Sequence, residues 1–148
     1  MRQLEEAVQS QWKTPINVIN QDTERKIVYY LDKDQHVVGI YKYDNGNYIY
    51  DNEQSEGMQF SFEEGIPFYV YYKHFEEAGN IVYGAITSDD NEVDKFIISY
   101  KNGEKQTISA KNNTFIAPIP ISIDPDNFMS KIKAADAFDS EGNVIVSW

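Results

Sequence analysis

Apolar and polar residues alternate along most of this chain, in short runs separated by turn-forming residues. A period of two is typical of β-strands, and these runs are rich in aromatic and β-branched residues, which favour strands. Gly84, inside one such run, indicates a close approach of two backbones. The pattern predicts a mostly antiparallel β protein, with strands at 16–19, 26–31, 36–43, 48–50, 58–62, 68–75, 81–87, 96–100, 105–110, 114–116, 134–138 and 143–148.

The N-terminal segment 2–12 shows a different period. Leu4, Val8 and Trp12 recur every four residues, which places an apolar stripe along one side of a helix. Pro15 follows closely, and the residue before a proline avoids helical backbone angles. We therefore expect a helix over residues 2–12, with Trp12 buried against a sheet.

The clearest hairpin turns at Asn102-Gly103, because both residues tolerate a positive φ. A three-residue loop would place Phe96 opposite Ile108, whereas a two-residue loop would place Ile97 there. A shift of one residue exchanges the buried face of a strand, so the pattern leaves two registers open.

A second reversal, at residues 111–113, leads into the short apolar run 114–116. This run would add a third strand beside the hairpin, so we predict a three-stranded meander in this region. Pro118 and Pro120 are expected to end the regular pairing, because proline donates no hydrogen bond to a sheet.

An Asn-Gly pair at 45–46 predicts another hairpin. A two-residue loop pairs Tyr43 with Tyr48 and Tyr41 with Tyr50, so four tyrosines share one face. Tyrosine has an apolar ring and a polar hydroxyl, so such a face suits either a sheet core with wet edges or a platform for sugars and peptides. The predicted binding surface consists of this face with two possible extensions, and its residues are Tyr41, Tyr43, Tyr48, Tyr50, Tyr69 and Tyr71.

The run 63–67, Glu-Glu-Gly-Ile-Pro, is the best candidate for a domain boundary. We expect residues 1–65 to form a helix packed on an antiparallel sheet, and residues 66–148 to form an immunoglobulin-like β-sandwich or a partial barrel. Composition does not change at the boundary, so we expect two lobes that share contacts. The predicted fold class is mainly β, either all-β or α+β.

Charge and composition exclude several functions. The chain has 148 residues and a formal net charge of −11, from 24 acidic and 13 basic residues. This charge disfavours nucleic acid and anionic membranes as partners. It is expected either simply to keep the protein soluble or to favour cations or a basic partner surface. Cysteine is absent, which rules out disulfides and thiolate chemistry. No apolar run approaches about 20 residues, so we expect no membrane span in this chain.

Candidate catalytic groups are few. The only histidines are His36 and His74, the latter followed by Glu76 and Glu77. Neither histidine has a partner at the spacing of a zinc site, so both are expected at the surface or in a hydrogen bond. Nucleophile elbows, phosphate loops and dinucleotide fingerprints are also missing. We therefore predict no catalytic residue, no metal site and no cofactor.

Two acidic segments, 89–94 and 136–143, carry oxygen ligands of the kind that calcium prefers. Neither has the ligand spacing of an EF-hand. Asp, Asn, Ser and Gly are also the residues that turns require, so the same composition is expected without calcium. The sequence leaves open whether calcium binds.

Two groups of segments resemble known proteins. LEEAVQSQWKTPINVIN, followed by KIVYYLDKDQHVVGIYKY, resembles a segment of secreted proteins and lipoproteins of low-GC Gram-positive bacteria. IVYGAIT, VDKFIISYKNGEKQTI and IKAADAFDSEGNVI are similar to the immunoglobulin-like or fibronectin-like β-modules of the same proteins. The resemblance implies an extracytoplasmic location, with the signal or lipid-anchor segment absent from this sequence, and it supplies no catalytic residues.

These observations together predict a non-catalytic extracytoplasmic binding or spacer module at a Gram-positive cell surface. Its partner would be a protein or a cell-wall glycan, contacted through the tyrosines. One alternative is a small enzyme or enzyme inhibitor that uses His74 with Glu76 or Glu77. Another is a structural subunit of a larger assembly, joined by strand addition at exposed sheet edges.

Overall fold

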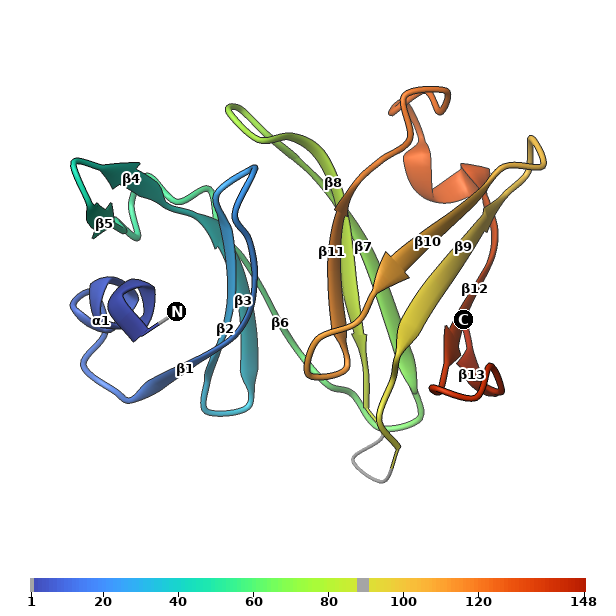
Figure 1. Cartoon of the computed structure of the whole chain (residues 1–148), viewed down its shortest axis with the longest axis horizontal. Coiled ribbons are helices and arrows are strands. Elements are labelled where there is room, and N and C mark those ends of the chain that lie inside the picture. The colour runs from blue at the N-terminus through green and yellow to red at the C-terminus, as the bar shows by residue number, and fades with distance from the viewer. Residues whose placement is uncertain (1, 88–90) are drawn as a thin grey trace. The chain divides into compact units, whose positions relative to one another are not determined.

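The computed structural model describes residues 2–87 and 91–148 (Figure 1). In this part the chain is mainly β, with one short α-helix and several antiparallel sheets. The predicted domains 1–65 and 66–148 stay a prediction. The chain divides into two compact units, the first made of Met1–Glu63 and Phe75–Ala78, the second of Glu64–His74 and Gly79–Trp148.

The first unit contains the helix and a four-stranded antiparallel sheet in the order β1-β2-β3-β6. A separate two-stranded hairpin, β4–β5, lies beside the helix (Figure 1). The elements are α1 (Arg2–Gln9), β1 (Ile16–Asp22), β2 (Ile27–Asp32), β3 (Gln35–Ile40), β4 (Lys42–Asp44), β5 (Asn47–Ile49) and β6 (Met58–Ser61).

Helix α1 ends at Gln9, three residues before the predicted end. The backbone N–H groups of Gln11 and Trp12 donate to carbonyls three residues back, and not four as in an α-helix, so the chain ends in a tighter 3-10-like turn. The Gln9 side chain then accepts the Ile16 N–H at 3.0 Å and donates to the Thr14 carbonyl at 2.8 Å. This side chain connects the end of the helix to the start of β1. The spacing of apolar residues gives no sign of this connection.

The core of the first unit lies between α1, the sheet and the hairpin. Leu4 and Val8 are fully buried, as the helical stripe predicts. Trp12 is half-buried, and its indole N–H donates to the Tyr30 hydroxyl at 3.0 Å. The buried members of this core are Leu4, Val8, Ile16, Val18, Val28, Tyr30, Val37, Tyr41 and Tyr50.

The second unit contains two antiparallel sheets, in the orders β11-β8-β7 and β10-β9-β12-β13. A short 3-10 helix, η1, runs directly into β12. The elements are β7 (Phe68–Phe75), β8 (Gly79–Ile86), β9 (Lys95–Tyr100), β10 (Lys105–Ser109), β11 (Thr114–Pro118), η1 (Phe128–Lys131), β12 (Ile132–Phe138) and β13 (Val144–Ser147).

The hairpin β9–β10 has the three-residue loop. Phe96 lies opposite Ile108, and the Tyr100 N–H donates to the Glu104 carbonyl at 2.8 Å. Gly103 has a φ of 95°, which suits glycine at this position of the loop. Alternate residues of β9 therefore point into the core, and Phe96 is fully buried.

The predicted three-stranded meander is wrong, because β11 pairs with β8 and not with β10. Asn112 and Asn113 both have a left-handed backbone, and they turn the chain across to the other sheet. Phe115 and Ala117 are then buried in the core that the two sheets share. Pro118 is the last residue of β11, where a missing N–H is tolerated.

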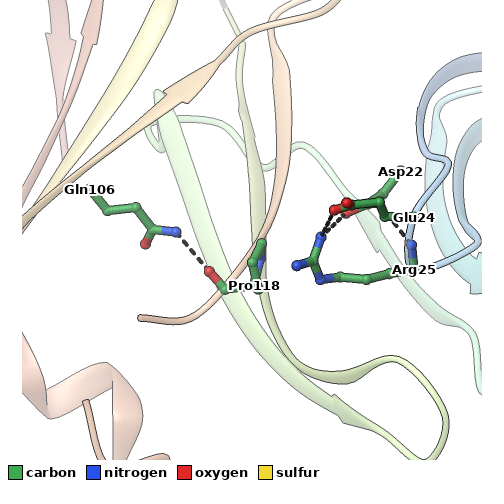
Figure 2. Close-up of polar contacts among 5 residues, drawn as sticks. All are labelled: Asp22, Glu24, Arg25, Gln106 and Pro118. Carbon is green, nitrogen blue, oxygen red and sulfur yellow. Dashed lines mark hydrogen bonds and ion pairs between the residues drawn. The ribbon is translucent and has the colours of Figure 1, made fainter. Parts of the chain in front are cut away.

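Side-chain hydrogen bonds connect the two sheets of the second unit. The Gln106 amide on β10 donates to the carbonyl of Pro118 on β11 at 2.7 Å (Figure 2). The Tyr100 hydroxyl donates to the Gln106 amide oxygen, also at 2.7 Å. Gln106 therefore holds β10 and β11 together although they belong to different sheets.

The core of the second unit takes side chains from both sheets. Gly84 allows the closest approach, because a Cβ atom there would lie 2.0 Å from the Tyr69 carbonyl oxygen and 2.7 Å from the Phe115 ring. This confirms the close backbone approach predicted for Gly84. The buried members of the core are Phe68, Val70, Val82, Ile86, Val93, Phe96, Ile98, Tyr100, Ile108, Phe115, Ala117, Ile123, Phe128, Ile132, Ala135 and Ala137.

Candidate functional site

The tyrosine hairpin has the predicted pair of Tyr43 with Tyr48, whereas Tyr41 and Tyr50 lie just outside its two paired strands. Tyr43 on β4 lies opposite Tyr48 on β5, and the two-residue turn between the strands is Asn45-Gly46. Both turn residues have a positive φ, 51° at Asn45 and 82° at Gly46, which matches the twist of a tight hairpin. The hairpin therefore forms as the local sequence predicts.

The four tyrosines of the hairpin differ sharply in exposure. Tyr41 and Tyr50 are each 4% exposed and belong to the core of the first unit. Tyr48 is partly buried against that core, whereas Tyr43 is 51% exposed. The surface that a partner can reach is therefore Tyr43 with the outer part of Tyr48, whereas Tyr41 and Tyr50 are buried in the core.

The tyrosine rings form a continuous row. The ring centroids of Tyr43 and Tyr48 lie 4.8 Å apart, with the planes inclined at 60°, and those of Tyr41 and Tyr48 lie 5.6 Å apart. Edge-to-face contacts of this kind add to the energy of burial. The Tyr48 ring thus lies between the buried ring of Tyr41 and the exposed ring of Tyr43.

A buried hydroxyl pair anchors the base of the hairpin. The Tyr50 hydroxyl lies 2.9 Å from the Tyr30 hydroxyl, and Trp12 donates to Tyr30. Burial raises the pKa of both tyrosines, so both stay protonated at neutral pH. Gly39 makes room for this pair, because a Cβ atom there would lie 2.6 Å from the Tyr50 hydroxyl.

Tyr69 and Tyr71, the two possible extensions of the binding surface, belong to the second unit. Tyr69 is 5% exposed and Tyr71 is half-buried. Their rings stack at 6.1 Å, and the Tyr71 ring lies 5.7 Å from that of Tyr83 on β8. These tyrosines form an aromatic row of their own across β7 and β8.

His36 lies inside an aromatic cluster of the first unit. It is 7% exposed, and its Nδ1 atom lies 2.7 Å from the Tyr29 hydroxyl. The rings of Phe60 and Phe62 lie 4.8 Å and 4.3 Å from the imidazole. Burial lowers the pKa of His36 to about 4, so this histidine is uncharged at neutral pH. It is a buried, hydrogen-bonded histidine.

His74 is exposed, on β7 of the second unit. Its Nδ1 atom lies 2.9 Å from the side-chain oxygen of Asn80, which also accepts the Tyr72 hydroxyl at 2.6 Å. Because the oxygen of an amide only accepts, we infer that Nδ1 carries the proton. The hydrogen bond of this ring nitrogen goes to an amide and not to a carboxylate.

The acidic turns provide no metal cluster in the described residues, where no group of three metal-ligating side chains converges. Asp89 and Asp90 of the first acidic segment lie outside the described residues. In the second segment, Asp139 accepts the backbone N–H groups of Glu141 and Asn143. The N–H of Asn143 is the main reason why the pKa of Asp139 is lowered, so this carboxylate stabilises the turn.

Comparison with known proteins finds no matching family model, no matching curated protein and no matching solved structure. Within residues 2–87 and 91–148, none of the helical segments is long and apolar enough to cross a membrane. The function is therefore inferred from the surface of the chain itself, where Tyr43 is the most exposed of the predicted contact residues.

Proposed function

We propose that this chain is a non-catalytic extracytoplasmic binding or spacer module at a Gram-positive cell surface, and that it contacts a glycan or a protein through Tyr43 and Tyr48. The location rests on the resemblance of its segments to secreted proteins and lipoproteins of these bacteria. The binding role rests on the geometry of the hairpin β4–β5.

The strand order of the second unit supports the modular part of this proposal. β8 pairs with both β7 and β11, while β9 pairs with both β10 and β12. The chain therefore passes between two sheets that share one core, as in the β-sandwiches of immunoglobulin-like and fibronectin-like modules. We assign residues 66–148 to this class of module.

One observation carries the binding role: Tyr43 is 51% exposed, and its ring lies against that of Tyr48. A free aromatic side chain loses conformational freedom when it binds, and that loss weakens binding. Contact with Tyr48, which packs on Tyr41, restricts Tyr43 in advance. A rigid ring with an apolar face and a polar edge is the type of residue that dominates binding surfaces.

The test is titration calorimetry with solubilised Gram-positive cell-wall fragments, with and without calcium. Tyr43→Ala is expected to weaken binding at least tenfold, which corresponds to about 1.4 kcal/mol. Trp148→Ala is the matched control, because Trp148 is also an exposed aromatic residue, 44% exposed. This control variant is expected to bind as the unaltered chain does.

Two results would overturn the proposal. One is the absence of any saturable heat with the cell-wall fragments. The other is equal binding by Tyr43→Ala and the unaltered chain, which would show that the ligand does not contact the hairpin. Circular dichroism of both variants would establish that the fold is retained in each.

A further inference from the structure

Two neighbouring hollows lie beside the tyrosine hairpin in the first unit, with volumes of about 530 and 500 Å³. They share the residues Ile40, Tyr41, Lys42 and Glu77. We call the two hollows together the Tyr41 groove. Each volume lies within the range of small-molecule binding sites, which is about 300–1,000 Å³.

The floor of the Tyr41 groove is apolar and fixed. Ile40 ends β3, and Tyr41 is 4% exposed, with its hydroxyl accepting a hydrogen bond from the Gln21 amide at 3.4 Å. Ile49 adds a side chain that is 49% exposed. The exposed apolar surface of this floor therefore comes mainly from Ile40 and Ile49, and it suits the aliphatic part of a long side chain such as lysine or arginine.

The larger hollow is rich in carboxylates. Asp51, Glu56, Glu76 and Glu77 line it, against the single cation Lys42. The excess of three negative charges favours a positively charged ligand, as does the net charge of −11 on the whole chain.

One of these carboxylates is held in place. Both oxygens of Glu56 lie within hydrogen-bond distance of the Glu76 backbone N–H, at 3.0 and 3.3 Å. Glu56 also has a left-handed backbone, with a φ of 54°, a conformation that costs energy in a residue other than glycine. The negative charge at this position is thus preorganised, which reduces the cost of binding a cation.

The smaller hollow is electrically balanced. Arg25 donates to Asp22 at 3.2 Å and to Glu24 at 3.3 Å, as Figure 2 shows. Lys26, Lys42, Asp44 and Glu77 also line this hollow, so its positive and negative side chains are equal in number, and Tyr43 lines it as well. It therefore suits the uncharged backbone of a peptide better than a second charged group.

We infer that the Tyr41 groove binds a peptide segment that carries a lysine or arginine side chain. The aliphatic part of this side chain would lie on Ile40, Tyr41 and Ile49, and its charged end would meet the carboxylates around Glu56. The peptide backbone would continue past Tyr43. This inference rests on the proposed function, because it names the class of partner for the same surface.

The probe is the capped peptide acetyl-Ala-Ala-Lys-Ala-amide, added to the protein at low salt and followed by NMR. A final peptide concentration of about 10 mM allows Kd values in the millimolar range to be measured. Two matched peptides replace lysine by acetyl-lysine or by norleucine, which keep the aliphatic chain and remove the charge. The lysine peptide is expected to bind at least fivefold more tightly than either.

Two variants are expected to act in opposite directions. Glu56→Gln keeps the acceptor for the Glu76 N–H but removes the charge, and should weaken binding about two- to fivefold. Lys42→Gln removes a cation beside the ligand and should strengthen binding by a similar factor. The matched controls Asp34→Asn and Lys33→Gln make the same changes of charge in the turn between β2 and β3, and should leave the affinity nearly unchanged.

Equal affinity for the lysine and norleucine peptides would overturn the inference, as would equal effects of the groove variants and their controls. If cell-wall fragments still bind through Tyr43 while the lysine peptide does not, the inference fails and the proposed function stands. If neither the fragments nor the peptide binds, both fail.

Discussion

The hydroxyl oxygens of Tyr30 and Tyr50 lie 2.9 Å apart in the core of the first unit, and their rings meet edge to face at 5.7 Å. Tyr30 belongs to β2 of the four-stranded sheet, and Tyr50 belongs to the segment that follows the hairpin β4–β5. The pair therefore attaches the exposed hairpin to the core, and the position of Tyr43 depends on it.

Tyr50→Phe is expected to lower the free energy of unfolding by about 1–2 kcal/mol. The substitution keeps the ring but leaves the buried Tyr30 hydroxyl without one of its two partners, and lost partners of buried polar groups cost this much. Urea denaturation provides the measurement. Tyr43→Phe is the control, because it removes the hydroxyl of an exposed ring; an equal loss in both variants would contradict the role of the buried pair.

Tyr41→Ala and Tyr43→Ala should differ strongly in their effect on stability. Tyr41 is 4% exposed, and truncation of a buried aromatic residue costs about 3–5 kcal/mol. Tyr43 is 51% exposed, and its loss removes one cross-strand pair, with a cost below about 1 kcal/mol. Thermal or urea unfolding of both variants tests this; a cost for Tyr43→Ala as large as that for Tyr41→Ala would place Tyr43 in the core.

Gly84→Ala is expected to destabilise the second unit by more than about 2 kcal/mol. The added Cβ atom would overlap the Tyr69 carbonyl oxygen, and a strand backbone moves aside only at the cost of its own hydrogen bonds. In an unstrained position the same change stabilises a protein by about 0.4–1 kcal/mol. A variant as stable as the unaltered chain in calorimetry would contradict the close packing of β7 and β8.

Protonation of His36 should destabilise the fold between about pH 6.5 and 4. Its pKa is about 4 in the folded chain and 6.5 when unperturbed, so the unfolded chain takes up the proton first as the pH falls. The free energy of unfolding therefore falls through this window, by at most about 3 to 4 kcal/mol at about 1.4 kcal/mol per pKa unit, and this contribution is complete above pH 6.5.

The variant His36→Gln isolates this contribution, because carboxylates titrate in both proteins and His36 in only one. The difference in unfolding free energy between the two proteins is expected to change between pH 7 and pH 4. A difference that stays constant over this range would show that His36 titrates alike in the folded and unfolded chains.

Local sequence determined most of the secondary structure. The turns at 45–46 and 102–103 were predictable because Asn and Gly tolerate a positive φ, and that preference acts within two or three residues. The length of the second loop, and with it the register of β9 and β10, was left open by the sequence. The helical stripe of Leu4 and Val8 was predictable for a similar reason, since one residue per turn repeats along one side of a helix. The predicted helix was too long because the side chain of Gln9 reaches forward to Ile16, a contact that periodicity does not encode.

The tertiary structure decided which strands pair and which tyrosines are exposed. The run at 114–116 could pair with either of two neighbours, and burial of Phe115 between two sheets selects β8. Likewise, alternation places Tyr41, Tyr43, Tyr48 and Tyr50 on one face. Which of them are buried depends on the elements that pack against this face, and Tyr41 and Tyr50 are buried while Tyr43 is exposed. Hydrogen bonding in turns is local, whereas burial depends on residues distant in sequence. The sequence therefore located the tyrosines, and only the folded chain shows that Tyr43 is the exposed one.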